Sequence, residues 1–311
     1  MTAEAQPAVR DRTWIVAGGA ALWGTDALLR LPLATELPAT TVVLAEHVIV
    51  AVLISPMIVR AIRRAARVCG PRQWAALIGI GVGASAVATA LFTAAFVQSG
   101  PITPVVLQKL QPLVAVALAA VLLGERLRRT YLPFLVVALG ASWLLAFPDP
   151  FGVSVQGVVG ALMAIGAAAL WAAGTVLGRY VSPVLRPGEV TGLRYAFGLL
   201  GSAAAVAVTG APVLPPVADL PGLAGLALIP GLLAMLIYYH GLRGTPASRA
   251  TLAELAFPAT AAVVGVVVLG ETMTATQWAG LALLAVTVTL FSWHERRPAA
   301  RAAVRVPEMA A

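Results

Sequence analysis

The chain contains little charge. Asp, Glu, Lys and Arg together make up 11% of its 311 residues, whereas 60% are hydrophobic and the mean hydropathy is +0.91. Soluble domains carry about 25% charged residues. A chain this apolar has too few polar groups to cover a water-exposed surface, which excludes an ordinary soluble domain. We therefore expect an all-α membrane protein whose main solvent is lipid.

Cysteine and histidine are also scarce. Cys69 is the only cysteine, which excludes an internal disulfide framework. His47, His240 and His294 show no paired spacing, so the chain lacks the pattern of a metal site or of a membrane-embedded enzyme. A Walker A motif is also missing, which argues against nucleotide-driven activity. We therefore expect no enzyme and no cofactor.

What the sequence does contain is a series of ten apolar runs separated by Pro- and Gly-rich breaks. Runs of about twenty apolar residues are long enough to cross a bilayer as helices. The expected spans are 14–34, 40–59, 74–97, 101–123, 131–147, 156–180, 189–209, 222–242, 247–269 and 275–293.

Basic residues fall on alternate sides of these spans. If the N-terminus is cytoplasmic, the outer loops hold no Lys or Arg, while the inner segments hold clusters such as Arg60 to Arg72 and Arg126 to Arg129. This asymmetry follows the positive-inside rule and places both termini in the cytoplasm. Short arginine-rich loops are unlike a nucleic-acid-binding stripe, so no nucleic acid partner is expected despite a pI near 10.7.

Two stretches of the chain repeat one another. Pro112 precedes Gly124-Glu125 by the same spacing as Pro258 precedes Gly270-Glu271, with an offset of 258 − 112 = 146. Ala21-Leu22-Trp23 and Ala169-Leu170-Trp171 repeat with an offset of 148. A unit of five helices is odd, so its second copy should enter the membrane inverted. We expect repeats at 1–148 and 149–295, and a disordered basic cytoplasmic tail at 296–311.

Ionisable residues inside the spans are candidates for a solute or coupling site, because each costs roughly 2.5–3.5 kcal/mol at the bilayer centre unless paired or hydrated. Asp26 and Arg30 lie four residues apart and can neutralise each other as a structural pair. Glu46 and Arg194 lie near helix starts, where an interfacial position is the alternative. The candidates are Asp26, Arg30, Glu46, Lys109, Arg194 and Glu254.

The repeated prolines point to a site at equivalent depths in the two halves. A proline inside a helix frees the carbonyl four residues earlier. For Pro112 this residue is Gln108, and for Pro258 it is Glu254. Such irregular backbone is tolerated in membranes where protein or a water-filled cavity satisfies it, although a simple packing kink is the alternative.

Three aromatic residues complete the candidate site. Trp23 and Trp171 lie in the middle of repeat-related spans, where they either line a cavity or pack in the core. Tyr239 lies near the end of a span and either lines a cavity mouth or belongs to the aromatic belt.

These residues resemble the EamA-like branch of the drug/metabolite transporter superfamily along nearly the whole chain. The similarity lies in Ala21 to Gly24, Leu110 to Glu125, Leu193 to Tyr195 and Phe257 to Glu271. The resemblance implies two five-helix bundles around a central cavity, alternating access, and small organic solutes. The family often has an arginine at the start of helix two, where this chain has Glu46.

The balance of acidic and basic residues at depth suits a solute with both charges. We expect a secondary-active transporter in the inner or plasma membrane that exports a small polar or zwitterionic metabolite, such as an amino acid, with proton coupling as a hypothesis. Lys109 would hold a carboxylate, and Glu254 or Asp26 an amine or a proton. The alternatives are a flippase or carrier for a lipid-linked or sugar substrate, and broad-specificity drug efflux. Membrane lipids are the other expected partners.

Overall fold

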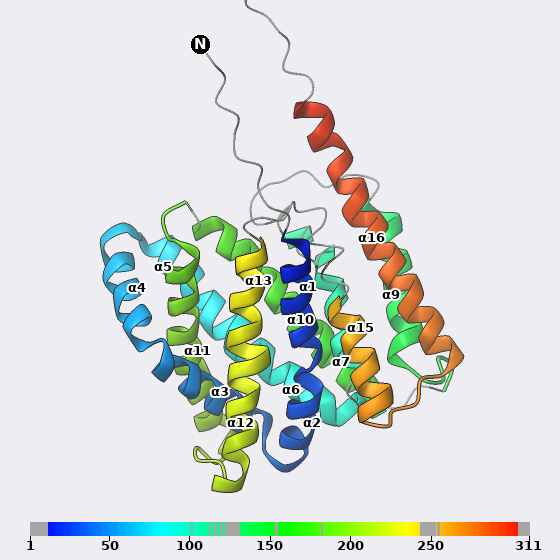
Figure 1. Ribbon diagram of the computed structural model, residues 1–311, viewed down its shortest axis with the longest axis horizontal. Helices are drawn as coiled ribbons and strands as arrows, with labels where there is room; N and C mark the ends of the chain where they lie inside the picture. Colours follow the sequence, from blue (N-terminus) through cyan, green and yellow to red (C-terminus); the bar gives the residue numbers. More distant parts are fainter. Residues whose placement is uncertain are drawn as a thin grey trace, which may run out of the picture.

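The computed structural model is entirely helical in its regular secondary structure, within the residues that it describes (Figure 1). These residues are 12–100, 102–111, 113–114, 117–118, 121, 131–152, 155–181, 183–242, 253 and 256–303.

The first half contains α-helices, one π-helix and one short 3-10 helix. In chain order they are α1 Thr13–Gly24, α2 Asp26–Glu36, α3 Ala39–Leu53, α4 Ser55–Val68, α5 Pro71–Ile78, η1 Gly79–Val87, α6 Ala88–Ser99, α7 Ile102–Leu107, η2 Gln108–Leu110 and α9 Tyr131–Ala146.

The second half begins with two long helices and is interrupted twice by π-helix. Its elements are α10 Val155–Val181, α11 Pro187–Thr209, η3 Val217–Asp219, α12 Leu220–Leu226, η4 Ala227–Leu233, α13 Ala234–Leu242, α15 Ala256–Val263, η5 Val264–Val268 and α16 Ala275–Ala303.

Four of the described helical segments are long and apolar enough to cross a membrane, or five if the bent pair α3 and α4 counts as one span. The other spans expected from the sequence correspond to shorter or interrupted helices, or include residues outside the described ranges. Many large apolar side chains of these helices, such as Val52, Leu162 and Val267, are exposed. This exposure is what lipid-facing positions require, and the molecule is a multi-pass membrane protein.

The first expected span, 14–34, is divided at Thr25. The backbone N–H of Thr25 bonds the carbonyl of Leu22 at 3.1 Å, and the Thr25 hydroxyl donates to the same carbonyl at 2.7 Å. These bonds tighten the end of α1, and α2 begins at the next residue, Asp26. An acidic residue in the first turn is favourable there because of the helix dipole.

The second expected span, 40–59, ends earlier than predicted. The chain bends by 83° between α3 and α4. Pro56 lies at the start of α4 and has no backbone N–H, so it cannot continue the hydrogen-bond ladder of α3. The arginine-rich segment after the bend, which the sequence suggested was a loop, is therefore largely helical.

The π-helices follow the internal duplication. The first, η1, begins at Gly79 and the second, η4, begins at Ala227, with an offset of 227 − 79 = 148. This is the offset of the repeated Ala-Leu-Trp motif. Because π-helical turns are rare and concentrate at functional sites, a matched pair marks a feature shared by both repeats.

Helix packing shows the same duplication. Helix α1 packs on α13 and α15, and its counterpart in the second half, α10, packs on α6 and η2, which correspond to α13 and to the beginning of α15. The equivalent helices α3 and α11 pack on each other, as do α9 and α16, which form a pair at one side of the bundle in Figure 1. Each contact therefore has its repeat-related partner, as expected for two halves arranged about an approximate two-fold axis.

The last helix extends further than the sequence suggested. Helix α16 continues to Ala303, whereas the apolar run ends near residue 293 and a disordered tail was expected from 296. Residues 304–311 lie outside the described ranges.

Candidate functional site

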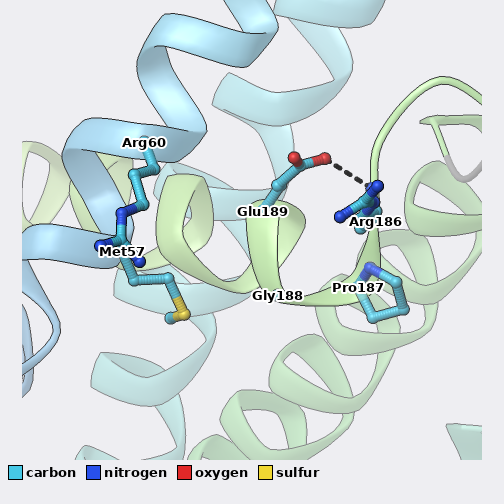
Figure 2. Close-up of a pocket in the computed structure, with 6 residues that line it drawn as sticks. All are labelled: Met57, Arg60, Arg186, Pro187, Gly188 and Glu189. Atoms are coloured by element: carbon cyan, nitrogen blue, oxygen red, sulfur yellow. Dashed lines mark hydrogen bonds between the residues drawn. The ribbon is translucent and has the colours of Figure 1, made fainter.

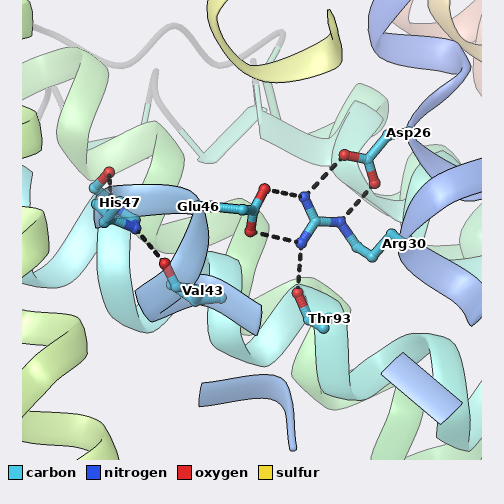
Figure 3. A network of polar contacts seen from close by, with 7 residues as sticks. Asp26, Arg30, Val43, Glu46, His47 and Thr93 are labelled. Carbon is cyan, nitrogen blue, oxygen red and sulfur yellow. Dashed lines mark hydrogen bonds and ion pairs between the residues drawn. The ribbon is translucent and has the colours of Figure 1, made fainter. Parts of the chain in front are cut away.

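A buried arginine lies at the centre of a cluster of polar side chains inside the bundle (Figure 3). Arg30, from α2, donates through Nε and Nη2 to the carboxylate of Asp26 at 2.6 and 2.9 Å. It donates through Nη2 and Nη1 to the carboxylate of Glu46 at 2.9 and 3.1 Å. Nη1 also donates to the Thr93 hydroxyl at 2.7 Å. All five N–H groups of the guanidinium are thus used.

Three helices position this cluster. Asp26 and Arg30 lie one turn apart on α2, Glu46 comes from α3, and Thr93 comes from α6. The side chains of Arg30, Glu46 and Asp26 are 5%, 12% and 14% exposed, so most of their charge is removed from solvent. The expected pairing of Asp26 with Arg30 is confirmed, and Glu46 is a second, buried partner of Arg30.

The cluster carries one more negative charge than positive. With both carboxylates ionised, its formal charge is 1 − 2 = −1. A net charge away from solvent is unfavourable unless a counter-charge or a proton compensates it. The cluster can therefore accept a proton or a cationic group while Arg30 remains in place.

Among the residues that the structure describes, the charged cluster occurs in the first repeat only. With the offset of 148, the counterparts of Asp26, Arg30 and Thr93 are Gly174, Gly178 and Gly241. A Cβ atom at Gly174 would lie 2.5 Å from the Cβ of Ala84, and one at Gly241 would lie 2.7 Å from the backbone nitrogen of Val16. Close helix packing thus takes the place of Asp26 and Thr93 in the second half, whereas a Cβ at Gly178, the counterpart of Arg30, would meet no atom within 4 Å. The counterpart of Glu46 is Arg194.

A second polar cluster connects α3, η1 and α11. His47 Nδ1 lies 2.8 Å from the carbonyl of Val43, so this nitrogen must be the donor. In neutral imidazole Nε2 is then the acceptor, and the Ser85 hydroxyl donates a hydrogen bond to it at 2.9 Å. Ser85 Oγ in turn accepts a hydrogen bond from Arg194 Nε at 3.3 Å.

Arg194 is bound far less completely than Arg30. Besides Ser85, it contacts the carbonyl of Ala84 in η1, at 3.1 Å from Nη2. No carboxylate of a described residue lies within 4.0 Å of its guanidinium. These two hydrogen bonds use two of five N–H groups. Arg194 is partly buried, and no described residue accepts a hydrogen bond from its other three N–H groups, so they can donate to an anionic group.

The two predicted tryptophans lie in the aromatic core near these clusters. Trp171 packs edge-on against Phe92 with ring centroids 5.2 Å apart, and the Arg30 guanidinium carbon lies 5.6 Å from the Phe92 centroid. Trp23 packs on Tyr238 at 4.8 Å. Both tryptophans are partly buried, and Trp171 is linked to the Arg30 cluster through Phe92.

The prediction that Pro112 leaves the backbone carbonyl of Gln108 without a hydrogen bond is wrong. Residues Gln108–Leu110 form a 3-10 turn, and the Gln108 carbonyl accepts the backbone N–H of Gln111. A shorter-range bond thus replaces the one that Pro112 cannot make. Gln108 itself is partly buried.

The remaining predicted site residues lie outside the described ranges, wholly or in their side chains. Pro112 and Glu254 are not described. The structure describes the backbones of Lys109, Tyr239 and Pro258, which are helical, but not their side chains. Their roles remain predictions.

Two residues of the clusters, Thr93 and Ser85, were missed by sequence reasoning. A hydroxyl residue in an apolar helix is common and most often bonds its own backbone, so no spacing distinguished them. His47 stood out as a histidine in an apolar span, but only the fold shows that it connects to Arg194. Within the described residues, no group of three or more His, Cys, Asp or Glu side chains is arranged to hold a metal.

The chain matches known proteins over most of its length. The model of the EamA-like transporter family matches twice, at residues 13–147 and 158–293. An uncharacterized transporter of Bacillus subtilis strain 168, YwfM, is 31% identical over 60% of this chain. That match spans 62% of YwfM, which is less than two thirds of its length.

Two further matches cover more of the chain. The riboflavin transporter ImpX of Fusobacterium nucleatum is 31% identical over 70% of this chain and 74% of its own length. A solved crystal structure matches with a TM-score of 0.61 and 23% identity, covering 92% of this chain and 97% of the other, and supports the fold alone. With two consecutive family matches that together cover most of its residues, the chain belongs to the EamA-like transporter family, within the drug/metabolite transporter superfamily.

Proposed function

We propose that the protein is a secondary-active transporter that exports a small polar or zwitterionic metabolite, such as an amino acid, across the cell membrane. The observation that carries this proposal is the contrast between two buried or half-buried arginines. Arg30 has all its N–H groups bound, whereas Arg194 has two hydrogen bonds and no described carboxylate partner. Arg194 is therefore the group that binds the carboxylate of the solute.

The Asp26–Arg30–Glu46 cluster provides the complementary charge. Its excess of one negative charge attracts the ammonium group of a zwitterion or a coupling proton. Glu46 and His47 are consecutive on α3, so the cluster and the hydrogen-bond chain to Arg194 share one helix. A solute bound at Arg194 can thus affect α3, which carries Glu46 of the acidic cluster, through the hydrogen bonds of Ser85 and His47.

The paired packing of the two halves supports alternating access as the mechanism. In this proposal, 1–148 and 149–295 are inverted repeats that rock against each other with both termini in the cytoplasm. The mirrored helix contacts and the matched π-helices support this arrangement. Lys109 and Glu254, at related depths in the two halves, are proposed to complete the solute site.

The similarity to a riboflavin transporter favours a second candidate solute. Riboflavin is aromatic and carries no carboxylate, so it would stack on an aromatic pair such as Trp23 and Tyr238 rather than depend on Arg194. The two candidates therefore differ in which substitution abolishes binding.

Thermal stabilisation of purified protein tests both candidates. The panel contains the proteinogenic L-amino acids, riboflavin and neutral sugars, and the variants tested alongside the wild type are Arg194→Gln, Trp23→Ala, Lys109→Ala and Glu254→Ala. We expect an amino-acid-like solute to raise the Tm of the wild type but not of Arg194→Gln. Stabilisation by riboflavin that persists in Arg194→Gln and disappears in Trp23→Ala would replace the first candidate by the second.

A further inference from the structure

A basic cavity opens where α4 meets the beginning of α11, away from the Arg30 cluster. Its volume is about 520 Å³, and it is lined by Met57 and Arg60 of α4 and by Arg186 to Glu189 (Figure 2). A neighbouring cavity of about 370 Å³ shares Arg186, Pro187 and Glu189 and adds Arg64. The two hollows therefore form one basic recess with three arginines around it.

These arginines are not neutralised by the rest of the described structure. Arg60, Arg64 and Arg186 are exposed, and no described carboxylate lies within 4.0 Å of any of them. The one acidic residue of the recess, Glu189, already accepts the backbone N–H of Arg186 at 2.7 Å and caps α11. The recess thus has a formal charge of 3 − 1 = +2.

The shape of α4 places this recess at the edge of the bilayer. One face of α4, with Ala61 and Ala65, is buried in the core. A second face exposes Val59 and Ile62, which are 46% and 44% exposed. With about 100° between successive residues, the arginines lie on a third face, opposite to Ile62. The exposed arginines of this third face are Arg60, Arg63, Arg64 and Arg67.

Such a helix cannot lie in the hydrocarbon, because four charged side chains would each cost roughly 2.5–3.5 kcal/mol there. An amphipathic helix with exposed apolar residues beside arginines instead lies in the membrane interface. Its apolar side contacts acyl chains, and its arginines are at the level of the lipid phosphates. Basic pockets of this kind between membrane helices suit anionic headgroups.

We infer that the recess formed by Arg60, Arg64 and Arg186 binds the headgroup of an anionic phospholipid, with the acyl chains along the apolar side of α4. One guanidinium group can bind two phosphate oxygens at once through two parallel N–H···O bonds. Three arginines therefore provide enough donors for a phosphodiester and for the polar headgroup attached to it. Because the lipid would bridge α4 and the beginning of α11, it would join the segment after the α3 bend to the helix that carries Arg194. The inference does not depend on which solute is transported.

Native mass spectrometry of the detergent-purified protein tests the inference. The probes are dioleoylphosphatidylglycerol, dioleoylphosphatidylcholine and inorganic phosphate, each titrated separately and in competition. We expect the anionic lipid to remain bound to the wild type in preference to the zwitterionic lipid, and inorganic phosphate not to displace it. The variant R60Q/R64Q/R186Q should bind the anionic lipid about a hundredfold more weakly, because each arginine near an anionic lipid contributes to attraction.

The matched control removes the same number of charges from nearby exposed positions, as R63Q/R67Q/R72Q. The control should keep its preference for the anionic lipid with an affinity within about threefold of the wild type. Equal weakening in both variants would overturn the inference in favour of non-specific surface charge. Displacement of the lipid by inorganic phosphate would assign the recess to a free anion instead. If the first variant does not fold, equal binding of both lipids by the wild type would itself overturn the inference.

Discussion

At the residue scale, Arg30 and Arg194 have the same side chain but different hydrogen-bond partners. Arg30 is enclosed by two carboxylates and a hydroxyl, so its charge is neutralised and its geometry is fixed. Arg194 is held by a serine and a backbone carbonyl, both neutral acceptors. The first arrangement connects α2 to α3 and α6 through bonds that are costly to break singly, and the second leaves N–H donors of Arg194 without a described acceptor.

The structural role of Arg30 leads to a testable expectation. Arg30→Met leaves Asp26 and Glu46 buried without a counter-charge, and such a loss costs roughly 3–5 kcal/mol. We expect a markedly lower thermal midpoint in detergent, measured by intrinsic fluorescence. The triple variant Asp26→Asn/Arg30→Met/Glu46→Gln removes all three charges together and should recover a large part of that loss. A triple variant as unstable as Arg30→Met alone would contradict the ion-pair explanation.

The hydrogen-bond chain through Ser85 makes a separate prediction about Arg194. Ser85→Ala removes the acceptor of Arg194 Nε and the donor to His47 without changing any charge. We expect solute affinity to fall by roughly tenfold, because an arginine that loses one positioning bond is less ordered for its ligand. The measurement is the solute-dependent shift of the Tm, with Ser202→Ala as a control, since the hydrogen bond that the structure describes for the Ser202 hydroxyl lies within α11. An unchanged response in Ser85→Ala would mean that this chain does not position Arg194.

At the element scale, close helix packing depends on glycines at particular positions. In α1, a Cβ at Gly19 would lie 2.7 Å from the backbone nitrogen of Tyr238 in α13, and one at Gly24 would lie 2.7 Å from the carbonyl of Phe257 in α15. Such contacts involve backbone atoms, which cannot move aside as a side chain can. The lack of a side chain at Gly19 and Gly24 thus allows α1 to approach the backbones of both neighbouring helices closely.

This packing predicts different effects for two adjacent substitutions. Gly19→Ala should destabilise the protein by about 1–3 kcal/mol, as overpacking does, because α1 or α13 must shift. Gly18→Ala has no atom within 4 Å of the added Cβ and provides a control in the same helix turn. Thermal unfolding in detergent compares the two. Equal stability of both variants would show that α1 does not approach α13 this closely.

The positions of the helices were predictable from the sequence where a proline or the end of an apolar run marks a boundary, and not where the helix changes its turn or its direction. Apolar run lengths located the helices, and Pro71 and Pro187 begin α5 and α11, where their missing N–H is tolerated. The π-helices were not predicted, because Gly79 to Val87 has the composition of any apolar helix and only its contacts reveal the wider turn. The 83° bend was missed as well, although Pro56 lay within the expected span.

The candidate site was partly predictable for a similar reason. Asp26 and Arg30 were recognised because their spacing of four residues is a local property of a helix. Their contact with Glu46, sixteen positions away, depends on how α2 and α3 meet. The link from His47 to Arg194 spans two further helices, so no sequence interval could identify it.

At the scale of the whole molecule, one internal duplication accounts for the helix order, the matched π-helices and the mirrored contacts. The duplication is structural rather than chemical, since Asp26 and Arg30 correspond to Gly174 and Gly178, and the acidic Glu46 corresponds to the basic Arg194. A scaffold with related halves and a single asymmetric charged site suits alternating access, in which both halves move around one site.

The orientation of the molecule can be tested with its only cysteine. Cys69 lies between α4 and α5, on the side predicted to be cytoplasmic. A membrane-impermeant maleimide should label it in inverted vesicles and not in intact cells. Burial raises the pKa of the Cys69 thiol, so labelling should accelerate as the pH is increased above neutrality.

The control for orientation is Asp149→Cys in a Cys69→Ser background. Asp149 is exposed in the turn after α9 and belongs to the side predicted to be outside. It should be labelled in intact cells. Labelling of both positions from the same side would refute the predicted orientation.

The most direct test of the central claim is transport by purified protein in liposomes. Counterflow of the solute identified by thermal stabilisation would be compared for the wild type, Arg194→Gln and Arg194→Lys. We predict that the wild type exchanges the solute, that Arg194→Gln does not, and that Arg194→Lys retains partial exchange because it keeps the charge but loses the planar fork. Exchange by Arg194→Gln at the wild-type rate would contradict the assignment of Arg194 as the solute-binding cation.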